Sequence, residues 1–223
     1  KITKGGFTDT RAYREVIPPF YNEYSFATKE PGYAPEFEDT IMLFRPLFGT
    51  SYLLESYCLD HDFYGADRII ISSASAKTAM GFGYLLRKNH QNKVKAIGLT
   101  SARNKSFVLG LDCYDEVLTY EEIGQLETGG KAIFFDVAGN KSVLAAVHDR
   151  VGDDIVYSGQ VGQTHWDNAD PLKLTKGPKP VFWSGPDQVM KLRGRLGPAG
   201  MMAAMQASMI DFLMAAAGWI KMV

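Results

Sequence analysis

Short apolar runs alternate with helical patterns along the middle of the chain. The runs are rich in β-branched or aromatic residues and are bounded by polar turns, which is typical of buried strands. They cover residues 68–72, 94–100, 116–120, 132–138 and 154–159, and helical patterns cover about 77–89, 103–110 and 140–149. This alternation predicts an α/β fold, with a doubly wound, Rossmann-like parallel sheet covered by helices on both faces.

The segments on either side of this alternation follow other patterns. Residues 1–38 are rich in proline and aromatic residues, which predicts an ordered loop rather than regular structure. A helical pattern then runs to about Leu59, and we expect Pro46 and Gly49 to break or kink it. After the fifth strand we expect a long loop with one strand at 179–183 and then a helical tail, interrupted near Gly197-Pro198.

The composition is that of an ordinary soluble protein. The 223 residues carry a formal net charge of −1, and 46% of them are hydrophobic and 22% charged. A chain with this near-neutral balance is not expected to bind nucleic acid. Cys58 and Cys113 stand in no metal-ligand spacing. Two isolated cysteines favour buried thiols in a reducing compartment, so we expect a cytoplasmic protein.

The most apolar segment is residues 201–223, and it contains Gln206, Ser208 and Asp211. An acidic residue at the centre of a membrane span is costly, so a buried or interface helix is favoured and no membrane is expected. Such an apolar helix is consistent with a homodimer. Packing of the helix on a further domain is the alternative.

The turn after the first predicted strand is built from small residues and one cation. Ser73, Ser75, Ala76, Lys77 and Thr78 lie between the isoleucine run and a helical pattern. Small side chains let a diphosphate approach the backbone, and a helix N-terminus offers free N–H groups and a positive dipole end. The five residues are therefore candidates for nucleotide binding. The alternatives are a tight turn in which Ser75 caps the helix, and a degenerate P-loop, which is disfavoured because both motif glycines are absent.

The tip of the second predicted strand indicates which nucleotide is bound. Dinucleotide sites commonly place an acidic residue there, which binds the ribose 2′-hydroxyl of NAD. This chain instead has two hydroxyls and two cations, Thr100, Ser101, Arg103 and Lys105. Arginine binds a 2′-phosphate through charge-assisted hydrogen bonds, so the pattern favours NADP. The alternative is an ordinary solvated helix start that Ser101 caps.

With these segments in place, the chain resembles the nucleotide-binding half of the medium-chain dehydrogenase/reductase superfamily, on the quinone-oxidoreductase side. The resemblance covers about residues 40–160. The motifs that carry it are Thr50-Ser51-Tyr52, Thr-Ser-x-Arg-Asn after the second strand, 110–117 against the family's GAD-x-V, Tyr120-Glu121-Glu122 against Y-x-E, 136–139 against D-x-x-G, and Tyr157-Ser158-Gly159. The flanks, with PPFYNEY, VGQTHW and FWSGPDQ, look more like an uncharacterised branch known only as a domain of unknown function.

This resemblance implies a Rossmann domain whose barrel-like N-terminal partner domain is largely missing from the chain. It divides the chain into a remnant of or link to the missing domain (1–38), a dinucleotide-binding domain (39–165), and a C-terminal loop and helix that pack on this domain or on a partner (166–223). The family's turn reads G-x-x-G-G-V-G, and this chain departs from it. Ser73, Ala76, Lys77 and Ala79 stand where the glycines fall.

The resemblance also implies further cofactor contacts. Asp136 is expected to hold the ribose or simply to end its strand. The implied contacts, including those near the nicotinamide, are Thr50, Asp136, Gly159, Val161 and Gly162. Zinc-binding members of the superfamily take their ligands from the missing domain, and the four histidines show no ligand spacing, so no metal site is expected.

The candidate catalytic residues are His165, Tyr21 and Asn22. His165 follows the fifth strand and is a candidate proton donor, although a loop histidine bonded to backbone is the simpler interpretation. We therefore expect a metal-independent NADP(H)-dependent oxidoreductase that acts on a small carbonyl, enone or quinone-like molecule. The alternative is a nucleotide-binding sensor or scaffold that retains the Rossmann fold without catalysis.

Overall fold

The computed structural model describes residues 1–29, 33–162, 174 and 176–219. The chain divides into two compact units, and we describe each by itself. The first unit contains Lys1–Pro46, and the second extends from Leu47 to Lys221.

The first unit contains a small antiparallel sheet. Strand β1 (Gly6–Thr8) pairs with β2 (Glu23–Ser25). Phe7 lies opposite Tyr24, and their stacked ring centroids are 4.7 Å apart. The expectation of an irregular segment is therefore wrong for these two strands, because a cross-strand aromatic pair stabilises a ladder within the proline-rich sequence. Short 3-10 turns at Ala12–Arg14, Pro19–Asn22, Ala27–Lys29 and Pro35–Phe37 complete the segment.

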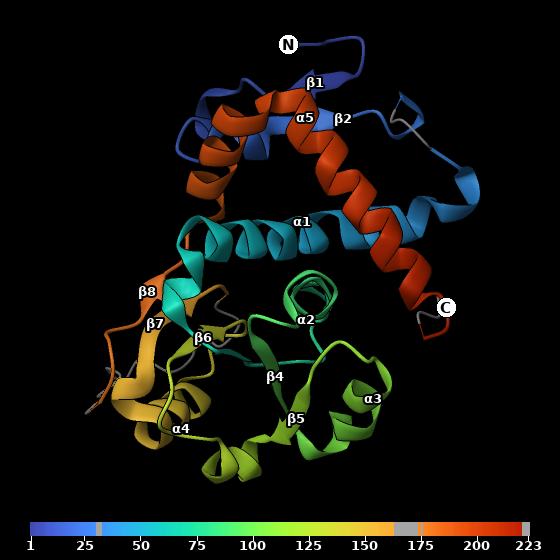
Figure 1. The fold of residues 1–223 in the computed structure, drawn as a ribbon. Helices are drawn as coiled ribbons and strands as arrows, with labels where there is room; N and C mark the ends of the chain where they lie inside the picture. Colours follow the sequence, from blue (N-terminus) through green and yellow to red (C-terminus); the bar gives the residue numbers. More distant parts are fainter. Residues whose placement is uncertain (30–32, 163–173, 175, 220–223) are drawn as a thin grey trace. The chain divides into compact units, whose positions relative to one another are not determined.

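The second unit is built around a six-stranded parallel sheet (Figure 1). The spatial order is β5-β4-β3-β6-β7-β8, so the order reverses between β3 and β6. This is the strand order of the dinucleotide-binding Rossmann fold, and it confirms the predicted fold class. The strands are β3 (Arg68–Ile71), β4 (Lys95–Thr100), β5 (Glu116–Thr119), β6 (Ala132–Asp136), β7 (Ile155–Gln160) and β8 (Val181–Phe182).

Helices cover both faces of this sheet. The helices are α1 (Glu38–Asp60), which continues through Pro46 and Gly49 without the expected break, α2 (Lys77–His90), α3 (Lys105–Gly110), α4 (Lys141–Val151) and α5 (Gly185–Ala216). Four 3-10 turns join them at Asp62–Gly65, Ala102–Asn104, Tyr120–Gln125 and Gly152–Asp154.

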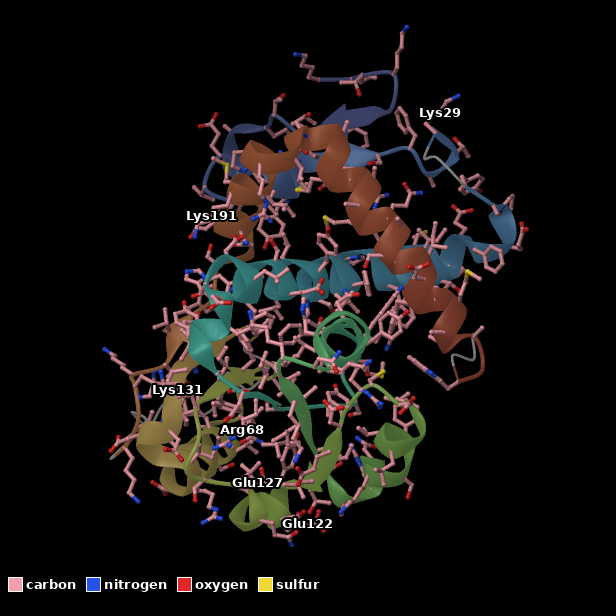
Figure 2. All side chains as sticks on the ribbon, in the orientation of Figure 1. Lys29, Arg68, Glu122, Glu127, Lys131 and Lys191 are labelled. Carbon is pink, nitrogen blue, oxygen red and sulfur yellow. The ribbon has the colours of Figure 1, made fainter. Side chains whose placement is uncertain are left out.

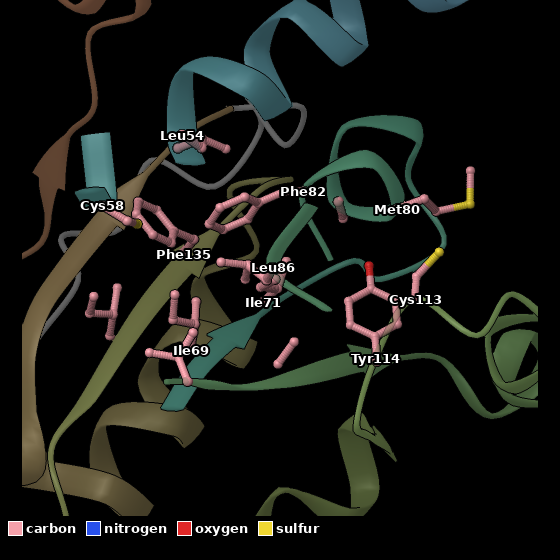
Figure 3. Close-up of a cluster of buried hydrophobic side chains, with 14 of the residues drawn as sticks. Leu54, Cys58, Ile69, Ile71, Met80, Phe82, Leu86, Cys113, Tyr114 and Phe135 are labelled. Carbon is pink, nitrogen blue, oxygen red and sulfur yellow. The ribbon is translucent and has the colours of Figure 1, made fainter. Parts of the chain in front are cut away.

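Two hydrophobic clusters hold these layers together. In one cluster, Leu54 of α1 and Phe82 of α2 pack with Phe135 of β6 (Figure 3). In the other, Leu144 of α4 packs with Phe134 of the same strand. Because Phe134 and Phe135 are neighbours that point to opposite faces, the sheet is buried on both sides. Cys58 and Cys113 are buried free thiols, as predicted.

Helix α5 has the predicted interruption. Gly197 adopts φ 70° and ψ 161°, outside the helical range, and Pro198 follows it. The left-handed φ favours glycine at this position. Within the described residues, α5 is the helix that is long and apolar enough to span a membrane, judged by length and composition alone. The expectation that the protein uses no membrane therefore stays a prediction.

Candidate functional site

The candidate site lies at the carboxyl edge of the sheet, where the strand order reverses. Ser72 follows β3, and its Oγ donates to Asp136 Oδ1 at the end of β6 over 2.7 Å. The same Oγ accepts from the Val137 N–H at 3.0 Å. In open α/β sheets, ligands bind in the crevice outside the strand ends at this reversal point. Ser72 therefore joins the two strand tips that border the crevice.

The turn between β3 and α2 contains a left-handed residue that is not glycine. Ser73 has φ 54°, a conformation that costs an L-residue about 1–2 kcal/mol. Neighbouring hydrogen bonds hold it there: the Ala76 N–H donates to the Ser73 carbonyl over 2.7 Å, and the Ala74 N–H donates to the Leu99 carbonyl over 2.9 Å. Ser73 thus takes a backbone conformation that glycine adopts more readily.

Helix α2 presents its amino end at this edge. Its N-cap residue, Ala76, supplies no side-chain hydrogen bond, and the first turn contains no acidic residue. The alternative in which Ser75 caps the helix is therefore wrong. The Ser75 hydroxyl instead accepts a hydrogen bond from Asn104 Nδ2 at 3.0 Å, which links the turn after β3 to the turn after β4. An uncapped helix start with half-buried Lys77 at its first position suits an anion.

The tip of β4 carries unpaired hydroxyls. Within the described part of the chain, Thr100 Oγ1 and Ser101 Oγ are buried and have no hydrogen-bond partner. Ser101 precedes a 3-10 turn without capping it, so the alternative role predicted for it is wrong. Buried hydroxyls are nearly always hydrogen-bonded, so these two require a polar partner, which an ordered water or a polar ligand would supply.

The two cations at this tip have different surroundings. Arg103 is exposed to solvent. Lys105 Nζ donates to Glu122 Oε2 over 2.6 Å, and Glu122 lies in the 3-10 turn after β5 (Figure 2). The lysine also lowers the pKa of the Glu122 carboxyl. The positive charge of Lys105, which was predicted to face a 2′-phosphate, is therefore paired with Glu122. Of these two cations, Arg103 is the exposed one.

Asp136 ends β6 and is fully buried. Its Oδ1 accepts from Ser72 Oγ and also from the Gly139 N–H, at 3.1 Å. Its Oδ2 is buried and has no hydrogen-bond partner among the described residues. Burial raises the pKa of this carboxyl above its ordinary value. Both predicted roles of Asp136 remain open, because it ends its strand and also keeps one oxygen uncommitted.

The chain after β7 passes close to the end of β6. The Val161 N–H donates to the Asp136 carbonyl over 2.8 Å. A Cβ atom on Gly162 would lie 2.3 Å from the Val137 carbonyl oxygen, and one on Gly159 would lie 2.9 Å from the Phe135 ring. Both positions therefore require glycine for packing, whatever contact they make with a cofactor.

A shallow hollow of about 230 Å³ lies between α4 and the 3-10 turn after β5. Its lining residues are Tyr120, Glu121, Ile123, Ser142, Val143 and Ala146. The Tyr120 hydroxyl is 3.4 Å from Ser73 Oγ, so the hollow adjoins the turn after β3. Both apolar and polar side chains line the hollow.

The other predicted site residues belong to several parts of the chain. His165 lies outside the described residues. Tyr21 and Asn22 belong to the first unit, where Asn22 Oδ1 accepts from Arg14 Nε over 2.9 Å and holds the local fold. Thr50 is half-buried in α1. Thr78 is buried, and its carbonyl accepts from Ser51 Oγ over 2.7 Å.

Three residues near the site were not found from the sequence. They are Ser72, Asn104 and Tyr114, and Tyr114 Oη donates to the Ala74 carbonyl over 2.9 Å. The signal for Tyr114 was its place in the GAD-x-V motif, where Cys113-Tyr114 replace glycine and alanine. Among the residues that the structure describes, no group of three or more His, Cys, Asp or Glu could hold a metal ion.

Comparisons with known proteins agree with the fold of the second unit. A model of the family described as "Protein of unknown function (DUF2855)" matches residues 1–223. No curated protein sequence matches the chain. A protein described as an NADPH:quinone reductase from Mesorhizobium loti has a similar structure, with a TM-score of 0.54, 10% identity, and coverage of 77% of this chain and 54% of that chain.

Two further solved structures share the fold. A mutant enoyl thioester reductase from Candida tropicalis matches with a TM-score of 0.52 and 10% identity, over 91% of this chain and 58% of that chain. An Etr1p mutant in complex with NADP and crotonyl-CoA matches with a TM-score of 0.50 and 12% identity, over 91% of this chain and 59% of that chain. The present chain thus spans a little more than half the length of these proteins. At 10–12% identity, these likenesses confirm the predicted Rossmann-like fold.

Proposed function

The chain belongs to the DUF2855 family, and on that premise we propose that it is an NADP(H)-dependent oxidoreductase that acts on a small carbonyl, enone or quinone-like substrate. The observation that carries the proposal is the edge at the β3–β6 reversal. There the uncapped start of α2 lies near the buried, unpaired hydroxyls of Thr100 and Ser101. A dinucleotide has anionic and hydroxyl groups that would satisfy both.

The residues present fit such a cofactor even though the usual glycines are absent. The turn keeps its small side chains, and Ser73 adopts the left-handed backbone that a glycine would take. A diphosphate would bind the N–H groups at the start of α2, with Lys77 adding positive charge. The exposed Arg103 would bind a 2′-phosphate, which favours NADP over NAD.

The cofactor would supply the hydride, and the chain's own residues would place it. Gly162 approaches the Val137 carbonyl so closely that no side chain fits at this position after β7. His165 as proton donor, with Tyr21 and Asn22 as further catalytic residues, stays a prediction. The buried free thiols are consistent with a reducing compartment, and we propose a cytoplasmic location.

Thermal unfolding with added nucleotide tests the proposal. A ligand that binds only the folded state stabilises it by about 2.7 kcal/mol at one hundred times its Kd. We expect NADPH to raise the melting temperature more than NADH does at equal concentration. An unchanged melting temperature with both nucleotides would remove the cofactor from the proposal.

A second candidate function is nucleotide binding without catalysis. It is favoured by the departure of the turn from the family's G-x-x-G-G-V-G, because the Rossmann fold is retained while Ser73, Ala76, Lys77 and Ala79 stand where the glycines fall. NADPH oxidation should be followed with a panel of quinones, enones and aldehydes. Binding with no turnover across the panel would favour this sensor or scaffold, and turnover of any member would favour the oxidoreductase.

A further inference from the structure

The turn after β3 contains no glycine, but two glycines near it, in α2 and in β4, make room for one aromatic ring. A Cβ atom on Gly83 of α2 would lie 2.7 Å from Tyr114 Cε1, and one on Gly98 of β4 would lie 2.9 Å from Tyr114 Cγ. The Tyr114 ring therefore fills a slot between α2 and β4 that only glycine leaves open. The residue is 6% exposed and lies beside Cys113 in the hydrophobic cluster (Figure 3).

The hydroxyl of this ring reaches the turn itself. Tyr114 Oη donates to the Ala74 carbonyl over 2.9 Å, while the Ala74 N–H donates to the Leu99 carbonyl over 2.9 Å. Both backbone groups of Ala74 are thus bound to the protein interior, and its side chain is fully buried. Burial raises the pKa of Tyr114, so its hydroxyl keeps the proton that it donates.

Ala74 directly follows the left-handed Ser73, so the bond from Tyr114 acts at the strained point of the turn. Without glycine, this backbone conformation persists only where the surroundings hold it. We propose that Tyr114 is a positioning residue for the nucleotide: its hydroxyl holds the Ala74 carbonyl inward and presents the start of α2 to a diphosphate. This role rests on the proposed function, and preorganising a binding turn raises affinity without adding a contact.

The full-length Tyr114→Phe variant tests the role, because it keeps the ring and removes only the hydroxyl. If only about a tenth of the variant molecules hold the turn in the conformation that binds the diphosphate, the Kd for NADPH rises about tenfold. Adenosine 2′-monophosphate lacks the diphosphate, so we expect its Kd to stay unchanged.

Tyr57→Phe is the matched control, since it removes a tyrosine hydroxyl that bonds to Tyr64, away from the turn. Equal affinity of Tyr114→Phe and wild type for NADPH would overturn the proposal, as would equal weakening of both ligands.

Hydrogen exchange without ligand supplies an independent measurement. The Ala76 N–H donates to the Ser73 carbonyl within the turn, and the Ala74 N–H donates to the Leu99 carbonyl of β4. In Tyr114→Phe we expect both N–H groups to exchange roughly tenfold faster. Unchanged exchange would contradict the positioning role. If the wild type fails to bind NADPH, the proposed function falls, and exchange still decides whether Tyr114 holds the turn.

Gly83→Ala provides a second variant that acts on the same ring. The added methyl group would lie 2.7 Å from the Cys113 carbonyl oxygen and 2.7 Å from Tyr114 Cε1, so it would displace the Tyr114 ring together with the backbone beside it, while alanine favours the helix. We expect it to weaken NADPH and to leave adenosine 2′-monophosphate unchanged. Wild-type affinity for NADPH in this variant would count against the role of the ring.

Discussion

Arg103 and Lys105 stand two residues apart after β4, and their partners make them different. Lys105 is bound by Glu122, which also accepts from the Thr119 N–H, so the lysine belongs to the structure of the next turn. Arg103 is exposed. Of the two cations predicted to face a 2′-phosphate, Lys105 is therefore held in an ion pair, whereas Arg103, within the described part of the chain, is not.

We expect Arg103→Ala to weaken NADPH binding by about 1–3 kcal/mol and to change NADH binding little, because a charge-assisted contact to the 2′-phosphate is lost. Titration calorimetry with both nucleotides measures the difference. Lys131→Ala is the control, since Lys131 directly precedes β6 and so lies at the opposite edge of the sheet (Figure 2). Equal weakening of NADPH and NADH binding would show that Arg103 does not bind the 2′-phosphate.

His148 shows a buried titratable group whose role is structural. The residue is fully buried in α4, with Nε2 2.9 Å from Ser158 Oγ and Nδ1 3.1 Å from the Lys176 carbonyl. A carbonyl only accepts, so Nδ1 carries the proton and Nε2 accepts from the serine in the neutral ring. Burial lowers the pKa of His148 below its ordinary value.

This lowered pKa predicts a loss of stability in mild acid. The unfolded chain takes up a proton near pH 6.5 while the folded protein resists it, so the stabilisation is complete above that pH and falls below it. We expect the melting temperature to fall between pH 7 and pH 5, and to fall less in His148→Gln. His61→Gln controls for the loss of a histidine. An identical pH dependence in wild type and His148→Gln would contradict the assignment.

At the scale of elements, α5 is fastened to the second unit at two places. Near its start, Gln188 Nε2 donates to Asp60 Oδ2 at the end of α1 over 2.8 Å. Beyond the Gly197 interruption, the fully buried Phe212 stacks on Phe48 of α1 with ring centroids 5.0 Å apart. It also meets Tyr84 of α2 edge-on at 5.3 Å. Lys88 Nζ of α2 also donates to Asp211 Oδ2 over 2.6 Å, and Phe212 is the fully buried aromatic side chain among the contacts of this half of the helix.

Phe212→Ala should lower the free energy of unfolding by about 3–5 kcal/mol, because a buried aromatic side chain leaves a cavity. Met214 is two residues away and 73% exposed, so Met214→Ala should stay within about 0.5 kcal/mol. Urea unfolding of both variants gives the two values. A similar small loss in both would show that α5 is not anchored through Phe212.

At the scale of the whole molecule, α5 leaves large apolar residues exposed. Ile210 is 45% and Met214 73% exposed. Exposed apolar side chains on one helix are typical of an interface, so the homodimer stays our prediction. Sedimentation equilibrium should give twice the mass of the chain, and Ile210→Asp should return the mass of one chain. A wild-type mass of one chain would contradict the dimer and favour packing of α5 on another domain.

Much of the second unit could be predicted because its signals are local. Runs such as Ile69–Ile71 and Ala132–Asp136 are too short and too apolar for helices, and they appear as strands where predicted. The strands β1 and β2 were missed, because the pairing of Phe7 with Tyr24 joins residues seventeen positions apart within a proline-rich loop. At the site, the small residues of the turn were visible in the sequence, whereas the partners of Ser75 and Lys105 were not.

The sequence by itself determined the alternation of strands and helices, the small-residue turn after β3 and the absence of an acid after β4, since each depends on neighbouring residues. Tertiary structure alone decided that Lys105 pairs with Glu122, that Ser72 bonds to Asp136 and that Tyr114 holds Ala74. The physical reason is that such bonds join groups 17 to 64 positions apart in the sequence, and only the packing of the sheet and its helices brings them within reach.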